Sequence, residues 1–284
     1  MKNRSHADDI LSIPNDIIAV IWSNRSGFLN LLKLPESRTP TEDDAISGRK
    51  AGNQACLTFI FRQQQQSNMS DITLYSHASG PNPWKVVALL KELNLSYNTI
   101  FVDFQNKTPD FLSKNPNGRA PAIVDHKRND KALWESVAIL LYLEHHYDKE
   151  NRLWFTNEDE IADANQWLLF QASGIGPYFG QKAWFSNFHH EKIPSAIERY
   201  EKEVHRVLGV VEKHLEGKEY FVGNKYSIVD INNYVWLVNV PWLLNDYQTA
   251  FEKYPNTGAY VKRLGEHKGI KEAYAEKAAA AEKH

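Results

Sequence analysis

The chain has 284 residues, which is enough for one large or two medium-sized domains with a substantial core. Hydrophobic residues make up 42% and charged residues 24%, and a net charge of −2 gives no reason to expect nucleic acid or an anionic membrane as partner. The single cysteine, Cys56, excludes an internal disulfide, a cysteine zinc site and a CxxC redox couple within the chain.

No apolar run approaches the eighteen or so residues that a membrane-spanning helix needs. The apolar segment near the N-terminus, Ile17 to Trp22, is too short and lacks the basic start and small-residue cleavage site of a secretory signal. We therefore expect a cytoplasmic protein without a membrane partner.

Residues 1–68 differ from the rest, with broken apolar patches, a polar run over 36–44 and the tract Gln63 to Gln66. The segment could be a disordered extension, a targeting segment, or residues upstream of the true start codon. In the last two cases Met69 begins the folded unit. Because its periodicity is weak, we expect residues 1–68 to be dispensable for folding.

From residue 70 the pattern predicts an α/β domain over 69–150. Apolar and β-branched runs predict strands at 72–75, 97–104, 122–124 and 132–134, the last two joined by a polar turn at 126–130. Apolar residues at helical spacing predict helices at 84–95 and 136–147, with a short helix starting at 109–112. The order is βαβ, a short helix, a β-hairpin and a closing helix, which implies a mixed sheet.

After about residue 150 the strand signals stop, and an all-helical domain is predicted over 158–284. Helical periodicity covers 161–172, 193–215, 230–244, 254–264 and 269–280. Ser227 and Asp230 are spaced as in a capping box, so we assign Asp230 a structural role at a helix start and no catalytic one.

The candidate site is Trp134-Glu135-Ser136, where a predicted strand runs into a helix, together with the preceding loop from Asn117 to Ala122. Pro121 between small residues predicts a tight turn, compatible with a cis peptide bond, that exposes backbone. Glu135 offers a carboxylate to an ammonium group, and Ser136 and the helix start offer a hydroxyl and free N–H groups to a carboxylate. This surface is suited to both charged ends of an amino acid.

Several separated motifs, over 79–82, 117–122, 134–136 and 223–231, resemble those of the cytosolic glutathione transferases. The resemblance extends from residue 71 to about 275. It is strongest to the fungal group related to the yeast nitrogen-catabolite regulator and prion protein, and to the bacterial nu-class enzymes, through 98–101, 174–177, 180–181 and 197–200. It implies a thioredoxin-like N-terminal domain, an all-α C-terminal domain, a homodimer, and glutathione as co-substrate.

The residues fit a glutathione site. Glu135 would accept from the glutathione ammonium, while Ser136 and its helix start would hold the γ-glutamyl carboxylate. Ala120, before Pro121, would pair its backbone with the cysteinyl unit.

Two cations in the same region, Lys107 and Arg119, could reach the glycyl carboxylate of glutathione. Both could equally be solvated surface residues, and the sequence leaves that choice open.

The glutathione thiol must be activated, because the thiolate is the nucleophile. Asn82 is our first candidate donor and Ser79 the second, since the resemblance implies that the asparagine is the usual thiol contact in this group. Ser79 could instead cap the helix. Tyr75 is predicted as a core residue of the first strand, and the alternative is a tyrosine-type catalyst, because the resemblance implies that some classes of the family place theirs near this position.

The aromatic stretch that includes Phe179, Trp184 and Phe188 is suited to an apolar second substrate, although such runs also form cores and dimer contacts. The resemblance implies that Arg199 reaches a second glutathione, and the alternative is an intrahelical ion pair with Glu203. No metal site is predicted, because the adjacent His189 and His190 lack partners at ligand spacing.

The predicted function is conjugation of glutathione to an electrophile, as in detoxification, with disulfide reduction or peroxide reduction as related activities. The predicted folded unit contains no cysteine, so the attacking sulfur must belong to glutathione. The alternative is a regulatory or binding protein on the same scaffold. Residues 1–68 lack the long Asn-rich segment of the yeast regulator, which favours the enzyme.

Overall fold

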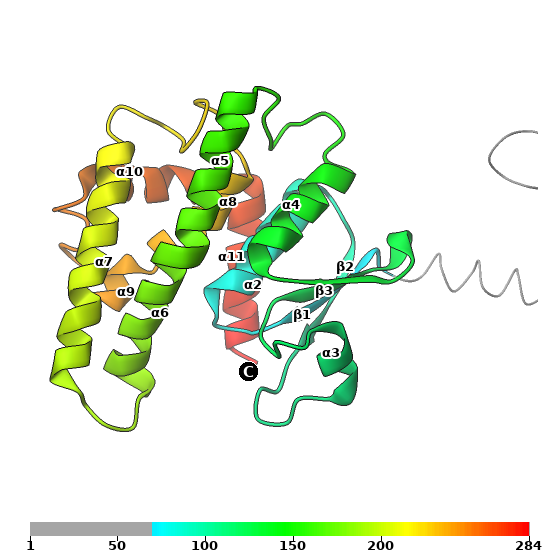
Figure 1. Ribbon diagram of the computed structural model, residues 1–284, viewed down its shortest axis with the longest axis horizontal. Coiled ribbons are helices and arrows are strands. Elements are labelled where there is room, and N and C mark those ends of the chain that lie inside the picture. Colours follow the sequence, from blue (N-terminus) through cyan, green and yellow to red (C-terminus); the bar gives the residue numbers. More distant parts are fainter. Residues whose placement is uncertain (1–69, 284) are drawn as a thin grey trace, which may run out of the picture. The chain divides into compact units, whose positions relative to one another are not determined.

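The computed structural model describes residues 70–283 (Figure 1), so the predictions for residues 1–68 lie outside the described part. The N-terminal domain contains β1 (Ile72–Ser76), α2 (Pro81–Glu92), β2 (Tyr97–Phe101), α3 (Pro109–Lys114), β3 (Ala122–Asp125), the 3-10 turn η1 (His126–Arg128), β4 (Lys131–Trp134) and α4 (Ser136–Tyr147). None of the helices in residues 70–283 is long and apolar enough to cross a membrane.

The four strands form one mixed sheet in the order β2-β1-β3-β4, which confirms the predicted arrangement. Strand β1 pairs in parallel with β2, with Ile72 opposite Tyr97, and antiparallel with β3, which pairs antiparallel with β4. The helix α2 connects the two parallel strands, as the βαβ order requires.

The two faces of the sheet pack against different elements because side chains alternate along each strand. Ile72 and Leu74 belong to the main core, which also contains the buried faces of α2 and α4. Tyr75 points to the opposite face and packs with Phe111 of α3 and Val124. The main core continues into the helical domain, so the two domains share one apolar interior.

Helix α2 begins three residues earlier than the apolar periodicity predicted. Gly80 is its N-cap and Pro81 its first residue, a position where proline's missing N–H is not needed. The helix ends at Glu92, and Asn94 takes a left-handed conformation with φ of 51°. The earlier start places Asn82 in the first turn, beside the candidate site.

The helical domain begins with a nearly continuous run, α5 (Glu158–Phe170), η2 (Gln171–Ile175), α6 (Gly176–Ala183) and η3 (Trp184–Phe188). Both η2 and η3 are π-helical turns. Pro177 follows the first of them, and its missing N–H cannot continue the α-helical ladder. The sequence predicted a helix only to residue 172, so the helical structure of 174–188 was missed.

The rest of the domain is α7 (Pro194–His214), α8 (Ile228–Leu237), α9 (Val240–Leu243), α10 (Pro255–Leu264) and α11 (Lys268–Ala281). The prediction of a single helix over 230–244 was wrong, because the chain turns at Val238 and Asn239 between α8 and α9. Pro241 lies in the first turn of α9, and in a continuous helix its ring would clash with the carbonyl four residues earlier.

The predicted capping box at the start of α8 is present. The Asp230 carboxylate is buried and accepts from the Ser227 N–H at 2.9 Å, the Phe221 N–H at 3.0 Å and the Tyr260 hydroxyl at 3.0 Å. Burial raises the pKa of Asp230 to about 6. The structural role assigned to Asp230 therefore extends beyond its own helix, to the loop before it and to α10.

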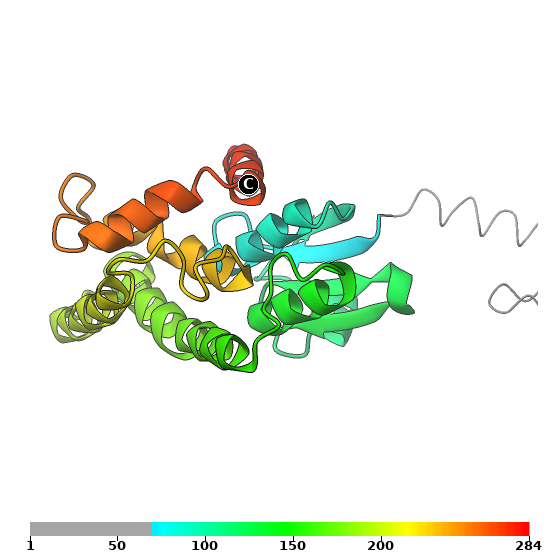
Figure 2. The same cartoon turned by 90° about the horizontal axis from the view of Figure 1, so that it is seen from above.

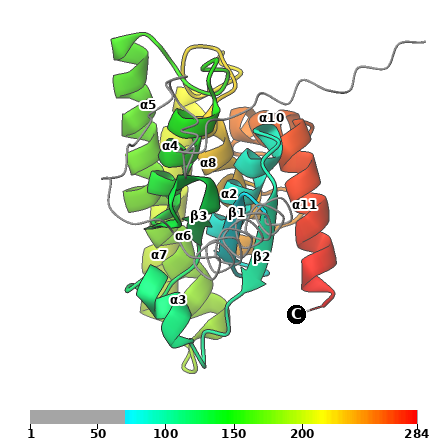
Figure 3. The same ribbon diagram turned by 90° about the vertical axis from the view of Figure 1, so that its right-hand side faces the viewer.

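Helix α11, the last helix, lies beside α2 and so packs against the N-terminal domain (Figures 2 and 3). Gly269 makes the close approach, because a Cβ there would lie only 2.6 Å from the Ala88 carbonyl oxygen. The Gly269 N–H donates to Glu92 at 2.9 Å. This contact sets where the later turns of α11 meet the site.

Stability should fall with rising pH because of Glu144, a buried carboxyl on α4. Burial and the nearby Asp148 raise the pKa of Glu144 to about 7, above the unfolded value of about 4.3. Its stabilising contribution is therefore complete below about pH 4 and is lost as the pH rises through 7.

We expect the unfolding free energy of Glu144→Gln, measured in urea, to fall less between about pH 5 and pH 8 than that of the unmodified protein. Asp230 acts in the same direction in both proteins and cancels in the comparison. If the unfolding free energies of the two proteins fell equally with rising pH, the raised pKa of Glu144 would be contradicted.

Candidate functional site

The loop between β1 and α2 is organised by His77. Its Nδ1 accepts from the backbone N–H of Ser79 at 3.2 Å and of Gly80 at 3.0 Å, and it lies 3.3 Å from the Ser79 hydroxyl. Because Nδ1 accepts, the ring is neutral with its proton on Nε2, and partial burial also lowers the pKa of His77. Ser79 does not cap α2, whose N-cap is Gly80, so the capping alternative was wrong.

Asn82 is oriented by a residue far along the chain. The Trp236 indole N–H donates to the Asn82 amide oxygen at 3.0 Å. An indole can only donate, so its partner must be the oxygen, and the amide nitrogen is turned the other way. Among residues 70–283 that nitrogen has no hydrogen-bond partner, and Asn82 is a wall residue of two cavities.

The smaller of these cavities, about 80 Å³, brings together most of the predicted glutathione-binding residues. Its wall is formed by Asn82, Asn115, Asn117, Arg119, Ala120, Pro121, Trp134, Glu135 and Ser136. It adjoins a larger cavity of about 640 Å³, which shares Asn82, Arg119, Glu135 and Ser136 with it and extends along η2 and α6. Segments more than fifty residues apart in sequence therefore meet here.

The backbone around the smaller cavity takes two unusual conformations. The Ala120-Pro121 peptide bond is cis, and Glu135 has φ of 70° and ψ of 110°, a conformation that a non-glycine residue rarely adopts. Glu135 is the N-cap of α4 but makes no side-chain capping bond, so the first N–H groups of the helix have no internal acceptor. A carboxylate and unpaired N–H groups thus lie side by side.

The loop before Pro121 is held by asparagine side chains. The Asn115 amide donates to the Arg119 carbonyl, and its oxygen accepts from the Asn117 N–H at 3.0 Å. Gly118 has φ of 64°, which suits glycine. These bonds place Arg119 in the walls of both cavities.

A buried lysine bonds to a wall residue of the larger cavity. Lys85 of α2 donates to Gln171 of η2 and to Asn232 of α8, both at 2.7 Å, and Gln171 lines that cavity. Burial lowers the pKa of Lys85 well below its usual value, opposed in part by the Glu135 carboxylate. Lys85 therefore connects the two domains through a residue of the cavity wall.

Two predicted glutathione contacts are not among the wall residues of these cavities. The ammonium of Lys107 is 5.8 Å from the centre of the Phe104 ring and would lie 3.3 Å from a Cβ built on Gly118, so it borders the loop that carries Asn117 and Arg119. Arg199, on the exposed surface of α7, donates to Glu203 at 2.9 Å, which is the ion pair that the sequence left as the alternative. Neither residue belongs to the walls of the two cavities among the described residues.

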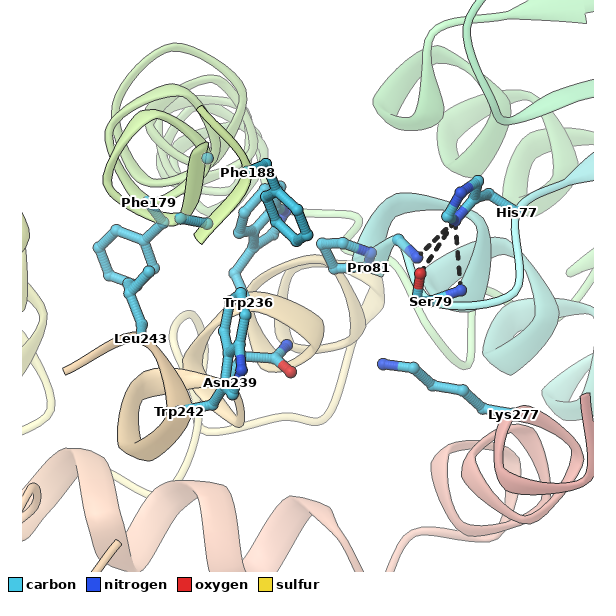
Figure 4. Close-up of a pocket in the computed structure, with 13 residues that line it drawn as sticks. His77, Ser79, Pro81, Phe179, Phe188, Trp236, Asn239, Trp242, Leu243 and Lys277 are labelled. Carbon is cyan, nitrogen blue, oxygen red and sulfur yellow. Dashed lines mark hydrogen bonds between the residues drawn. The ribbon is translucent and has the colours of Figure 1, made fainter. Parts of the chain in front are cut away.

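A third cavity, of about 540 Å³ (Figure 4), shares the wall residues Gly180 and Trp236 with the larger cavity. Phe179 and Phe188 line it as predicted for a second-substrate pocket, whereas Trp184 lines the larger cavity beside Glu135 instead. Sequence reasoning missed the other wall residues, namely His77, Trp236, Asn239, Trp242, Leu243 and Lys277. The α8–α9 break, which Pro241 could have indicated, brings Asn239 and Trp242 into this wall.

Two further predictions concern residues outside these cavities. Tyr75 is buried as expected, donates its hydroxyl to Asp110 at 2.9 Å, and has its pKa raised to about 12 by burial and by that carboxylate.

His189 and His190 do have a possible third metal ligand, contrary to the sequence argument, because Glu191 lies within ligand distance of both. The absence of a metal stays a prediction.

Comparisons with known proteins agree with this geometry. Residues 70–145 match the N-terminal domain of glutathione S-transferase, and residues 175–268 match the C-terminal domain. Glutathione S-transferase 2 of Schizosaccharomyces pombe is 45% identical over 230 residues, which cover 76% of this chain and 100% of that protein. Protein URE2 of Eremothecium gossypii is 45% identical over 60% of this chain and 49% of its own length.

Solved structures are similar as well. The glutathione transferase URE2P6 from Phanerochaete chrysosporium, in complex with oxidized glutathione, is 44% identical with a TM-score of 0.72, covering 75% of this chain and 99% of that one. Ure2p in complex with glutathione is 38% identical with a TM-score of 0.67, covering 72% and 98%. Both domain matches and a relative covered over its whole length show that this chain belongs to the glutathione S-transferase family.

Proposed function

We propose that this protein conjugates glutathione to an electrophile, with Asn82 activating the glutathione thiol. The observation that carries the proposal is the Trp236–Asn82 hydrogen bond, which occupies the amide oxygen and leaves the amide nitrogen free to donate, in a residue that lines both the smaller and the larger cavity. A neutral donor that bonds to sulfur stabilises the thiolate and lowers the thiol pKa. The thiolate would then attack a second substrate held in the third cavity.

Glutathione would lie along the smaller cavity. Its ammonium would bond to the Glu135 carboxylate, and its γ-glutamyl carboxylate to Ser136 and the free N–H groups of α4. The Ala120 backbone would pair with the cysteinyl unit, and Arg119 could reach the glycyl carboxylate. Lys107, whose ammonium borders Gly118 in the same loop, is a second candidate for the glycyl carboxylate, and Arg199 would make no contact in this arrangement.

Conjugation is supported by a relative from Phanerochaete chrysosporium, Ure2p5, which was cocrystallised with 1-(S-glutathionyl)-2,4-dinitrobenzene. That relative is 39% identical, with a TM-score of 0.70 over 75% of this chain. Disulfide reduction is a second candidate, because URE2P6 binds oxidized glutathione and the 640 Å³ cavity here adjoins Asn82. A cytoplasmic homodimer is expected from the family resemblance and stays a prediction.

The test is turnover by the purified full-length chain with glutathione and 1-chloro-2,4-dinitrobenzene, a glutathionyl disulfide, or a peroxide. Conjugation should be measurable above the uncatalysed rate. No turnover with any of the three, combined with measurable glutathione binding, would instead favour the regulatory alternative on this scaffold.

Replacing Ser136 by alanine should weaken glutathione binding. The hydroxyl would lose a charge-assisted hydrogen bond, which is worth about 1–3 kcal/mol. Calorimetric titration should show this loss in Ser136→Ala. The control is Ser113→Ala on α3, where the hydroxyl donates only to the Asp110 carbonyl. Equal affinity of both variants would contradict the placement.

A further inference from the structure

Lys277 brings a positive charge to an otherwise apolar cavity. The cavity of about 540 Å³ is walled by Phe179, Phe188, Trp236 and Trp242 on the helical side and by the loop before α2 on the other. Lys277 of α11 completes the wall, and in Figure 4 its ammonium points across the space toward Ser79 and Asn239. Among the described wall residues none is acidic, and His77 is neutral.

The charge of Lys277 has no partner among residues 70–283. No carboxylate lies within ion-pair distance, and the ammonium contacts only the face of Tyr274, at 5.1 Å from the ring centre. Burial alone lowers the pKa of Lys277, with no acid opposing it. Other lysines differ, since Lys271 of the same helix pairs with Glu266 at 3.1 Å and Lys91 of α2 pairs with Glu276 at 3.0 Å.

A half-buried, unpaired ammonium costs free energy that an anion can recover. The location of this ammonium is set by the packing of α11 on α2 through Gly269, so the charge is held at the cavity and is not free to swing away with a loop. Lys277 is a wall residue of neither the smaller nor the larger cavity, where glutathione is proposed to bind. The anion that it fits would therefore enter with the second substrate.

We propose that Lys277 makes this cavity selective for second substrates that combine an aromatic or apolar body with a carboxylate or sulfonate. This inference rests on the proposed conjugation function. The aromatic walls would hold the ring, and Lys277 would pair with the anionic group while the reactive carbon faces the glutathione sulfur near the start of α2.

Binding can be tested without catalysis, using 8-anilinonaphthalene-1-sulfonate and N-phenyl-1-naphthylamine, which differ only in the sulfonate. Fluorescence titration of the full chain should give Lys277→Met about tenfold weaker affinity for the sulfonate and a much smaller change for the neutral dye. Lys277→Arg should keep the affinity. Lys271→Met, on the same helix but outside the cavity, is the matched control and should leave both affinities unchanged.

Selectivity in the reaction can be tested with 4-chloro-3,5-dinitrobenzoate and its methyl ester. In each case the glutathione thiolate forms a bond to the ring carbon, the C–Cl bond breaks, chloride leaves with the electron pair, and the thiol proton goes to solvent. Lys277→Met should lower kcat/KM for the carboxylate about tenfold, and for the ester far less.

Three outcomes would overturn the proposal. The first is equal losses for carboxylate and ester with a raised thiol pKa, which would mean that Lys277 acts on the glutathione sulfur. The second is no effect on either substrate or dye. The third is an equal loss with Lys271→Met, which would mean a general surface-charge effect. If the unmodified protein turns over neither substrate, conjugation itself fails, and the dye pair still decides the role of Lys277.

Discussion

Replacing Asp230 by alanine is expected to destabilise the protein by about 4 kcal/mol, because several buried donors lose their acceptor at once. The carboxylate accepts from the Phe221 and Ser227 N–H groups, from the Ser227 hydroxyl at 3.1 Å and from the Tyr260 hydroxyl. These donors belong to the preceding loop, the cap of α8 and α10, so the loss should affect the whole helical domain. Urea unfolding followed by tryptophan fluorescence measures it.

The matched control is Asp246→Ala. Asp246 also accepts from backbone, at the Gln248 and Thr249 N–H groups, but it is partly exposed and these bonds lie at the surface, so water can replace it. A loss of about 1 kcal/mol or less is expected there. If both variants lost the same unfolding free energy, the buried bonds of Asp230 would contribute no more to stability than those of a surface turn.

Replacing Asn82 by alanine should lower turnover at neutral pH by about ten- to a hundredfold, and should raise the pKa of the bound glutathione thiol. The variant removes a hydrogen bond to a thiolate, which is worth roughly 1.5–3 kcal/mol. Ser79→Ala should lose less, because the Ser79 hydroxyl lies against His77 and is not oriented by Trp236. The pH–rate profiles of both variants measure the difference.

Trp236→Phe is a companion test, because it keeps an aromatic ring and removes the indole N–H that orients Asn82, together with the rest of the five-membered ring. It should shift the pH–rate profile in the same direction as Asn82→Ala, by a smaller amount. A shifted profile for Ser79→Ala together with an unshifted one for Asn82→Ala would reverse the assignment of the thiol donor.

The parts of this protein that could be predicted from sequence are those with local signals. Apolar and β-branched runs in the order βαβ plus hairpin predicted the mixed sheet. Helix α4 was predicted with its observed bounds, because the strand pattern ends at Trp134 and helical spacing begins at Ser136. The same local chemistry, a carboxylate and free N–H groups beside an exposed backbone turn, predicted an amino-acid-like ligand. The predicted glutathione-binding residues between 119 and 136 are close in sequence, and they meet in one cavity.

What only the tertiary structure decided is how distant segments meet. Asn82 and Trp236 are 154 positions apart, and no periodicity in either helix relates them. An aromatic residue has the same hydrophobic pattern in a core as in a cavity wall, so sequence could not separate Phe188, which lines the third cavity, from Trp184, which does not. Lys277 looks like an ordinary solvated lysine on its helix, and only the packing of α11 on α2 places its charge among aromatic rings.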